Sequence, residues 1–566
     1  MLNISYLKLI SFHSIQLLKR LKNNLNFFFN YNTFINNKHE IKCFKFMENF
    51  VNKSNKNTLF KKILIDSIFD NPAYWYRISL LRHTINIKDT EEVFVVGKWY
   101  NRKIKKNLNY LNCQNIQNLS NFYPKSNIVK KITHNLIKNT NEPNDILKWK
   151  LPLDFPTYAA YDCILKQQRK NVVNINSPDF YKIVYDGIRN LLAACEFINQ
   201  HNFDAIFMSQ IINFDQGGIA WAALRKKIKV YLITGHGGLN RFQKKNNLNQ
   251  LFYNKEHPQL YHLNQLNKSQ LKQLKKFGKK YLNDRINGKT NELGSLYSYR
   301  INNLKVSKKD ILSKFNWNPN LPIVCVYAQN WFDYPHAFGM KNFRDFRDWI
   351  DITISNIKQI KNVNWLIKPH PCDAWYGGET IKDIISDENY KNIKICPSNV
   401  SGSSLLKIVD GGVTVHGTIG LELSSLKKQV LLADNGWYGH FKFCKVAKST
   451  EHYGKLLKEI CWKDKISNVE CDHLYFYVAL MFCSPKWQSS ILIGNDTEQK
   501  NLYPMINDIF KNHEKELSKE IDLIKKWMLS DETSLHTFKM ISSKLYHNFQ
   551  IPLTSGYLKS LKKRKI

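Results

Sequence analysis

Short apolar runs alternate with longer amphipathic segments along most of this chain. The first apolar run covers residues 61–69, apolar residues at helical spacing follow at 73–85, and a second apolar run covers 91–100. Strand, helix and strand in this order predict a βαβ unit, whose two strands lie parallel in one sheet. The pattern therefore predicts an α/β domain that begins near residue 61.

The same alternation returns further along the chain. After a polar insertion at roughly residues 101–150, it resumes and completes a first α/β domain over residues 61–250. A second series predicts a similar domain over residues 317–455. Its strands are expected at 322–329, 363–371 and 392–397, with further helix and strand alternating over 404–434.

Three stretches flank and join the two predicted domains. Residues 1–60 form a basic, Asn-rich leader, interpreted either as a peripheral helix or as a segment that docks on an anionic bilayer. Residues 251–316 are polar with helical spacing and are expected to be a helical connector. Residues 456–566 also have a helical pattern and end in the basic text "KKRKI", so they are expected to form a helical extension.

Composition narrows the class of protein. The chain has 566 residues, of which 43% are hydrophobic, and this excludes a wholly disordered chain. The formal net charge of +38 suits anionic partners, although lysine is spread through Asn/Lys/Ile-rich text and points to no single partner. Eleven cysteines without a CxxC pair predict reduced thiols. With neither a transmembrane span nor a secretory signal expected, a cytoplasmic location is predicted.

Motifs at the ends of predicted strands are the candidates for chemistry, because open parallel sheets bind ligands beyond the carboxyl ends of their strands. Lys368-Pro369-His370-Pro371 follows the apolar strand at 363–367. Its two prolines fix the loop, while Lys368 and His370 can present N–H donors to a phosphate. The plain alternative is that His370 is a structural loop histidine.

A second motif runs from His416 to Glu422 and includes Gly417 and Thr418. Small residues between a strand and a helix let backbone amides approach an anion at the helix N-terminus. Glu422 in the first helical turn could accept ribose hydroxyls, or could be an acid favoured there by the helix dipole. A third motif, at residues 435–439, is either a loop that closes over a base or sugar or an ordinary turn.

The order of these motifs resembles the bacterial capsule polysaccharide biosynthesis family. The resemblance rests on "WFDYPHAFGMKNFRDFRDWIDITI", "LIKPHP" and "TVHGTIGLELSSLKKQVLLADNGWYG", and on the looser segments "YAAYDCIL" and "DAIFMSQIINFDQGGIAWAALRKKIKVYLI". It covers about residues 150–450. It implies a GT-B-like α/β fold, with two Rossmann-like domains facing a cleft, and a glycosyltransferase of surface carbohydrate assembly.

The resemblance also implies partners and roles. A nucleotide-sugar donor would lie in the C-terminal domain, with the donor phosphate held by His370 and the segment His416–Thr418. A glycan or lipid-linked glycan acceptor would lie against the N-terminal domain. GT-B resemblance implies that neither a metal nor a resident cofactor is needed, since the nucleotide sugar is a co-substrate. Lys368, His370 and His416 would then supply the positive and donor groups that a metal would otherwise provide.

Glycosyl transfer also needs a base that deprotonates the acceptor hydroxyl. The related enzymes that use CMP-activated acidic sugars carry an acidic-Gly motif, and the nearest match here is Asp215-Gln216-Gly217. Asp215 is therefore the first candidate. His236, in a glycine-flanked loop after a predicted strand, is the second, and Asp162 is a further one. Asp215 or His236 could instead be merely a helix cap or a loop residue.

Alternative functions remain open at this point. The same fold could serve a nucleotide-sugar 2-epimerase or a polyol-phosphate transferase. A nucleic-acid-binding protein would fit the charge, yet no RNP, zinc-finger or helix-turn-helix signature is present, so no specific nucleic-acid partner is expected. A scaffold role is disfavoured by the paired strand-end motifs. Contact with the inner membrane face through residues 1–60 and the basic tail is a further expectation.

Overall fold

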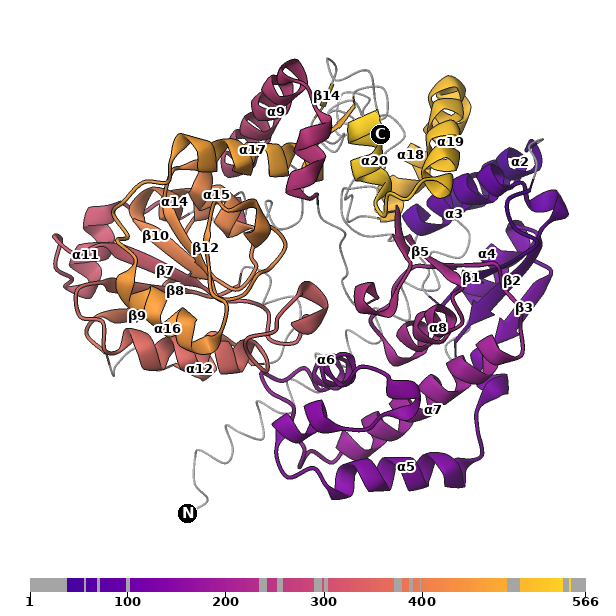
Figure 1. The fold of residues 1–566 in the computed structure, drawn as a ribbon, viewed down its shortest axis with the longest axis horizontal. Coiled ribbons are helices and arrows are strands. Elements are labelled where there is room, and N and C mark those ends of the chain that lie inside the picture. The colour runs from indigo at the N-terminus through magenta and orange to yellow at the C-terminus, as the bar shows by residue number, and fades with distance from the viewer. Residues whose placement is uncertain are drawn as a thin grey trace.

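Two six-stranded sheets, each covered by helices, organise the chain in the computed structural model (Figure 1). The α/β class with two Rossmann-like domains and a helical C-terminal region is therefore confirmed. The structure describes residues 38–54, 58–68, 72–97, 102–233, 242–251, 258–289, 298–299, 304–370, 379–385, 390–397, 399–485, 499–542 and 549–550.

The first sheet has the strand order β3-β2-β1-β4-β5-β6. Its pairings are parallel except for the last, between β5 and β6. The strands are β1 (Lys62–Asp66), β2 (Glu91–Val96), β3 (Asn115–Asn118), β4 (Ala205–Met208), β5 (Lys229–Ile233) and β6 (Phe242–Lys245). Since β1 lies between β2 and β4, the winding direction reverses there, and such a switch point is where doubly wound sheets bind ligands.

The second sheet repeats this winding with the order β12-β11-β10-β7-β8-β9, all parallel. Its strands are β7 (Ile323–Tyr327), β8 (Asn364–Lys368), β9 (Ile393–Ile395), β10 (Gly411–Thr414), β11 (Gln429–Leu432) and β12 (Lys445–Val446). Here β7 lies between β8 and β10, so the switch point falls beside the strand that precedes Lys368-Pro369-His370. Both sheets thus offer a ligand crevice at the same topological position.

Helices cover both faces of each sheet (Figure 1). The helices that accompany the first sheet are α2 (Lys38–Asn52), α3 (Pro72–Ile85), α4 (Arg102–Tyr110), α5 (Ser126–Lys138), α6 (Thr157–Gln168), α7 (Phe180–Asn199), α8 (Phe214–Arg225), α18 (Gln499–Asn512) and α19 (Glu514–Leu529). The others are α9 (Lys268–Ile286), α11 (Lys308–Phe315), α12 (Phe346–Ile357), α14 (Gly402–Ile408), α15 (Ile419–Ser425), α16 (Thr450–Glu459), α17 (Asn468–Phe482) and α20 (Leu535–Ser542).

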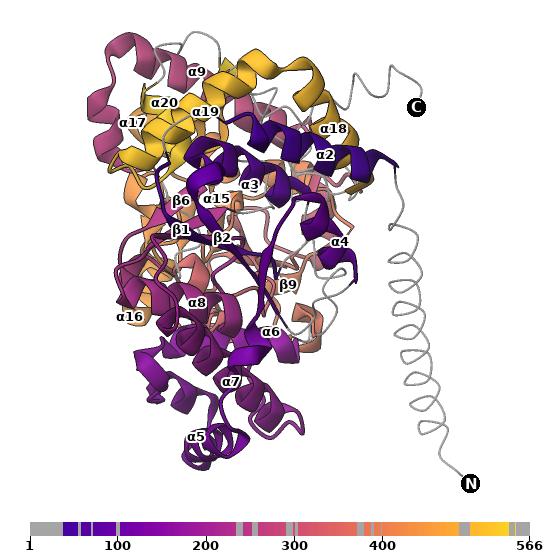
Figure 2. The ribbon, with the colours of Figure 1, turned by 90° about the vertical axis from the view of Figure 1, so that its right-hand side faces the viewer.

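The apolar strands of the first sheet are buried on both faces because alternate side chains point to opposite sides. Ile63 and Ile65 belong to a core shared with α2, α3, α18 and α19, whereas Leu64 belongs to a core shared with α5 to α8. Figure 2 shows α18 and α19 beside α2 and α3, although they come from opposite ends of the chain. The C-terminal helices therefore complete the core of the N-terminal domain.

The stretches outside the two predicted domains have definite places in the fold. The polar interval 101–150 contributes β3 to the first sheet and α5 to its cover, so it is not a simple insertion. In the predicted leader, α2 packs against α3 and α18, and in the predicted connector, α9 packs against α17. The sequence of residues 101–150 is too polar to suggest a strand. The physical reason is that β3 lies at the edge of the sheet, where its side chains are only half-buried.

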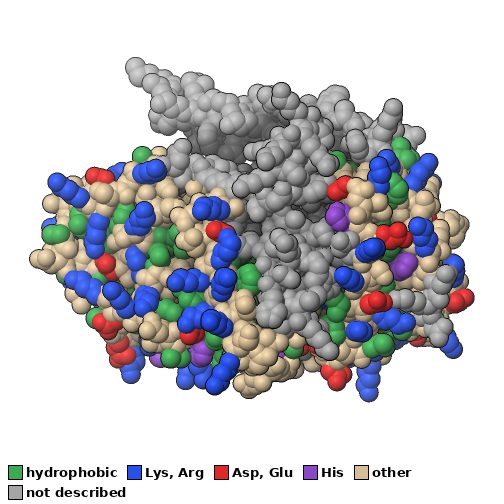
Figure 3. Space-filling view, turned by 90° about the horizontal axis from the view of Figure 1, so that it is seen from above, with side chains coloured by type: hydrophobic (Ala, Val, Ile, Leu, Met, Phe, Trp, Pro, Cys, Tyr) green, Lys and Arg blue, Asp and Glu red, His purple; other side chains and the backbone are tan. Residues whose placement is uncertain are grey.

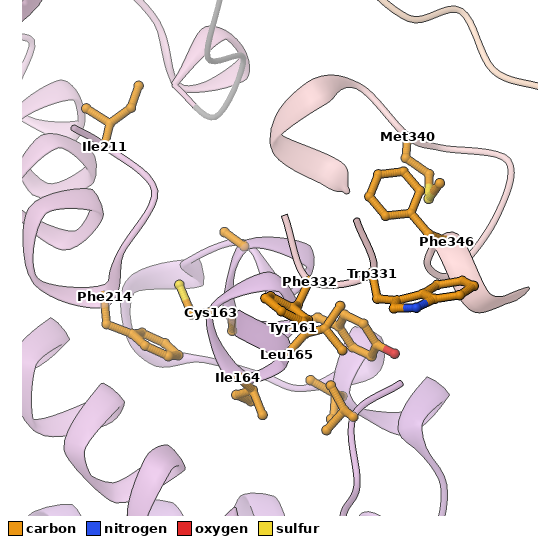
Figure 4. Close-up of a cluster of buried hydrophobic side chains, with 14 of the residues drawn as sticks. Tyr161, Cys163, Ile164, Leu165, Ile211, Phe214, Trp331, Phe332, Met340 and Phe346 are labelled. Atoms are coloured by element: carbon orange, nitrogen blue, oxygen red, sulfur yellow. The ribbon is translucent and has the colours of Figure 1, made fainter. Parts of the chain in front are cut away.

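The two domains share apolar contacts (Figure 4). Tyr161 and Leu165 of α6 lie beside Trp331 and Phe332, which belong to the loop that follows β7. All four side chains are almost fully buried. We refer to residues 328–345, between β7 and α12, as the bridging loop, since it carries the second domain onto the first.

No helix in the described part of the chain is long and apolar enough to cross a bilayer. The described cysteines are free thiols, and most of them are buried. The predicted leader is described only from residue 38, and the basic tail after residue 550 lies outside the described residues.

Candidate functional site

A cavity of about 140 Å³ lies at the switch point of the second sheet; we call it the C-terminal pocket. It sits beyond the carboxyl ends of β7 and β8 and beside the first turn of α15. The polar residues around it are Arg285, Ser298, Tyr299, Tyr327, Gln329, Lys368, His370, Thr418 and Glu422. The pocket is therefore lined by hydrogen-bond donors and acceptors that come from the strand ends, the N-terminus of α15 and the connector helix α9.

Five of the six predicted donor-site residues line this pocket: Lys368, His370, Gly417, Thr418 and Glu422. They meet because parallel strands bring their carboxyl ends to one edge of the sheet. The Lys368 Nζ donates to the carbonyl oxygens of Pro397 and Val400, at 3.2 Å each. These bonds hold its ammonium group at the edge of the pocket.

His370 lines the pocket, and its imidazole ring is neutral at neutral pH. Burial lowers its pKa to about 4, and the carboxylate of Asp333 in the bridging loop opposes that shift only in part. A neutral imidazole has one N–H donor and one acceptor nitrogen. His370 can therefore give a phosphate oxygen a hydrogen bond at neutral pH, and an approaching anion would raise its pKa.

Glu422 is already engaged by two side chains. Its carboxylate accepts from Arg285 Nε at 2.6 Å and from the hydroxyl of Tyr299. Arg285 also donates through Nη2 to the Thr418 hydroxyl at 3.2 Å. A ribose hydroxyl would thus share the carboxylate with these partners. Sequence reasoning missed Arg285, because it lies in a polar helix of the connector that carries no recognisable motif.

His416 does not line the C-terminal pocket. Its buried ring lies between Phe346 and Trp437, with ring centroids 5.6 Å and 6.3 Å away. Gly436 makes this close approach feasible, since a Cβ there would meet the His416 Cβ at 2.8 Å and its φ is +55°. The role of His416 in binding the donor phosphate stays a prediction. The loop at 435–439 packs against His416 through Gly436 and Trp437.

A second cavity, of about 440 Å³, lies at the switch point of the first sheet; we call it the N-terminal pocket. Its walls come from the carboxyl ends of β1 to β4, from α6 and α7, and from the first turn of α8. The polar and aromatic residues that line it include Tyr123, Lys166, Lys182, Asp186, Arg189, Asn190, Asn213, Asp215 and Tyr334. Tyr334 belongs to the bridging loop, so both domains build this pocket.

Asp215, the first base candidate, lines the N-terminal pocket and is partly exposed to it. It lies in the first turn of α8, where its Oδ1 accepts the backbone N–H of Gln216 at 2.8 Å. Burial raises the pKa of Asp215 above its ordinary value. A carboxylate that holds a proton more readily is a better general base. The second candidate, His236, lies outside the described residues.

Gln216, the middle residue of Asp215-Gln216-Gly217, has a structural role. Its Nε2 donates to Asp66 Oδ2 at 2.5 Å and to the Ser209 hydroxyl at 3.0 Å. Asp66 ends β1, and Ser209 follows β4, so these bonds tie the two strand ends together at the switch point. Burial raises the pKa of Asp66 as well. Gln216 therefore supports the floor of the site next to Asp215.

Asp162, the third base candidate, fastens the two domains together. It is buried in α6, and its Oδ1 lies 2.7 Å from His336 Nδ1 of the bridging loop. Its Oδ2 accepts the backbone N–H groups of His336 and Ala337 at 3.0 Å and 3.2 Å. With its oxygens occupied in this way, Asp162 anchors the bridging loop to α6 and does not face an open pocket.

The bridging loop joins the two pockets. Gln329 near its start lines the C-terminal pocket, and Tyr334 lines the N-terminal pocket and donates to Asn213 Oδ1 at 2.9 Å. Between them, Asp333 pairs with Lys166 Nζ at 3.2 Å and also acts on the charge of His370. One short loop segment, from Gln329 to Tyr334, therefore lies beside both pockets.

Metal ligands are a separate question. Among the described residues, no three His, Cys, Asp or Glu side chains are grouped so that they could hold a metal ion. The predicted independence of metal stays a prediction.

Comparison with known proteins gives only distant likenesses. No family model matches the chain, and none of the curated proteins matches it. A Thermosulfurimonas dismutans KpsC, a β-Kdo 2,4-transferase, is 13% identical with a TM-score of 0.32 over 48% of this chain and 79% of its own. A Neisseria meningitidis UDP-GlcNAc 2-epimerase solved with UDP-GlcNAc is 12% identical with a TM-score of 0.22, covering 74% of this chain and 97% of its own.

An epimerase of Methanocaldococcus jannaschii, solved with UDP-GlcNAc and UDP, gives similar figures: 10% identity and a TM-score of 0.24, over 73% of this chain and 97% of its own. At this level these likenesses assign neither an activity nor a ligand to this chain. The two pockets and the loop between them are the features of this chain that point to a function.

Proposed function

We propose that this chain is a glycosyltransferase that moves a sugar from a nucleotide-activated donor to a hydroxyl group of a growing surface polysaccharide. One observation carries the proposal: a ligand pocket lies at the switch point of each sheet, and the bridging loop contributes to both. A transfer between two substrates needs two adjacent sites, one for the donor and one for the acceptor. The resemblance of the strand-end motifs to capsule polysaccharide enzymes points to the same reaction.

The C-terminal pocket is the proposed donor site. The small residues Gly417 and Thr418 would let an anion approach the N-terminus of α15, where the positive end of the helix dipole favours negative charge, while the Gly417 N–H itself donates to Thr414 Oγ1 at 3.2 Å. His370 adds a neutral N–H donor and Lys368 a positive charge. These groups would stabilise the negative charge that develops on the phosphate as the bond to the sugar breaks.

The N-terminal pocket is the proposed acceptor site, with Asp215 as the base. The carboxylate takes the proton of an acceptor hydroxyl, and the freed oxygen electron pair forms a bond to the anomeric carbon of the donor. The bond from that carbon to the phosphate oxygen breaks, and the nucleotide leaves with the electron pair. The raised pKa of Asp215 and its exposure to the pocket support this role. His236 remains the alternative base.

The decisive experiment separates binding from turnover. The thermal midpoint of the purified protein is measured with CMP, UDP, GDP and CDP, and the nucleotide that stabilises it identifies the donor class. Asp215→Asn should keep that shift and lower turnover about 100-fold or more. Asp310→Asn is a matched control, because Asp310 occupies the first turn of α11, away from both pockets. Full activity in Asp215→Asn would remove the carboxylate from the mechanism.

The rival reaction, epimerisation of the nucleotide sugar, differs in one measurable way. An epimerase consumes nucleotide sugar with no acceptor present, whereas a transferase requires one. Turnover in the absence of acceptor that is unaffected by substitutions in the N-terminal pocket would favour the epimerase. The size of the second pocket, about 440 Å³, favours transfer because it leaves room for another substrate.

The acceptor is proposed to be a glycan or a lipid-linked glycan, met at the inner face of the membrane. The basic segments proposed to contact that face lie mostly outside the described residues. On the face seen in Figure 3, lysine and arginine are spread over both halves of the molecule with acidic groups among them. On the described part of that face, the basic side chains form no continuous track for a duplex nucleic acid.

A further inference from the structure

One face of α7 carries a row of ring-bearing and planar side chains one turn apart. Tyr181, Tyr185 and Arg189 are spaced at i, i+4 and i+8, which places them on the same side of the helix. The rings of Tyr181 and Tyr185 are stacked, with centroids 6.3 Å apart and an interplanar angle of 18°. The Arg189 guanidinium lies over the Tyr185 ring, 5.6 Å from its centroid. We call this row the α7 stripe.

The α7 stripe ends in the N-terminal pocket. Arg189 also lies over the ring of Tyr123, 4.4 Å from its centroid, and both residues line that pocket. At the other end Tyr181 is exposed over 44% of its surface. The stripe therefore leads from solvent to the cavity that holds Asp215, and Figure 1 shows α7 beside α5 along that edge of the domain.

The rings are held in place by polar contacts at their edges. The Tyr185 hydroxyl donates to Ser126 Oγ at 3.3 Å, and the Tyr123 hydroxyl donates to Asn190 Oδ1 at 3.1 Å. Asp186 pairs with Arg189 at 2.7 Å and with Lys182 at 2.5 Å. Aromatic faces are thus flanked by an ammonium, a carboxylate and an amide, and the exposed tyrosine is not an isolated apolar side chain.

We propose that the α7 stripe is an extension subsite for a glycan chain whose terminal unit occupies the N-terminal pocket. The C–H groups on one face of a sugar ring pack on the negative face of an aromatic ring, and its hydroxyls reach the polar groups beside it. From Tyr181 to Arg189 the helix rises about 12 Å, longer than a single sugar ring. This inference rests on the proposed function and deepens it: the acceptor is an oligosaccharide or polysaccharide and not a single sugar.

Binding as a function of glycan length tests the subsite. Two series of probes, from one to six units, are titrated by calorimetry: a neutral series of N-acetylglucosamine oligomers and an anionic series of sialic acid oligomers. In the wild-type protein, affinity in at least one series should rise about tenfold between one and four units. In Tyr181→Ala/Tyr185→Ala that increment should disappear, while affinity for the single unit and the thermal shift with nucleotide stay unchanged.

Tyr261→Ala is the matched control, because Tyr261 is exposed over 57% of its surface and lies outside both pockets. It should leave the length dependence intact. Absence of binding in both series, or an equal rise with length in the double variant, would overturn the subsite. Length-dependent binding without any sugar transfer would retain the subsite and reject the proposed reaction. Transfer at equal rates to short and long acceptors, in the wild type and in the double variant, would retain the proposed reaction and reject the subsite.

Discussion

At the scale of single residues, the site is set by how burial changes ionisable groups. His370 is kept neutral and Asp215 is made more basic by the same physical cause, the loss of water around a charged form. The two shifts suit opposite tasks, since His370 would donate a hydrogen bond and Asp215 would accept a proton. Perturbed groups of this kind gather at functional sites more often than elsewhere.

The first prediction concerns the pH dependence that His370 imposes. Because its pKa is about 4 in the folded protein and about 6.5 when unfolded, the unfolded state binds more protons in between. The free energy of unfolding should therefore rise with pH between 4 and 6.5, by about 1–3 kcal/mol from this group. Urea unfolding of wild type and His370→Asn across that window measures the difference. The bound nucleotide should raise the pKa of His370, seen in its imidazole NMR shifts.

The second prediction concerns Glu422. Because its carboxylate pairs with buried Arg285, Glu422→Ala removes the negative charge that balances this guanidinium and should cost about 3–5 kcal/mol of unfolding free energy before any nucleotide is added. A parallel Glu451→Ala variant, with an exposed acid in the first turn of α16, should change stability little. If Glu422→Ala is as stable as wild type but binds nucleotide poorly, the carboxylate serves the ribose alone.

At the scale of elements, α6 and the bridging loop decide how the two pockets face each other. Tyr161 of α6 donates to Asp345 Oδ2 at 2.5 Å, and Asp162, the next residue in α6, pairs with His336 of the bridging loop. The negative charges of Asp162 and Asp345 raise the pKa of His336, against the effect of its burial. A protonated His336 therefore strengthens the contact between the domains.

The third prediction follows from that shift. A histidine with a raised folded-state pKa contributes stability that is fully present below its unfolded value, near 6.5, and is lost as pH rises through the folded value. His336→Ala should thus destabilise by about 3–5 kcal/mol at pH 5.5 and by less at pH 9. Urea unfolding at both values checks this, with His134→Ala, an exposed histidine on α5, as the control. An equal cost at both pH values would show that His336 acts through packing alone.

The elements that sequence reasoning found are those whose burial is decided locally. Strands such as β1 and β8 are buried on both faces, so each shows as an unbroken apolar run. The edge strand β3 gave no such signal. The strand-end rule likewise predicted that Lys368 and Glu422 share a pocket, whereas Arg285 reaches it from α9, far away in the sequence. A contact between residues so far apart in the sequence produces no periodic pattern of apolar and polar positions.

At the scale of the whole molecule, the C-terminal helices pack against the N-terminal domain. The C-terminal helices return to cover the face of the first sheet that α2 and α3 leave incomplete. Trp527 of α19 is fully buried there, and its ring meets those of Tyr231 and Phe242 at centroid distances of 5.8 Å and 6.3 Å. The N-terminal domain therefore depends for its core on residues nearly three hundred positions further along the chain.

The last prediction tests that dependence. Trp527→Ala removes a large buried ring from the core beneath the first sheet and should lower the free energy of unfolding by about 3–5 kcal/mol. Leu529→Ala, two residues on in the same helix but exposed over 69% of its surface, should cost less than about 0.5 kcal/mol. Hydrogen exchange should accelerate in β1, β4 and β5 and remain slow in β7 and β8. Equal acceleration in both sheets would mean that the two domains unfold as one unit, because the contact between α6 and the bridging loop would then couple them fully.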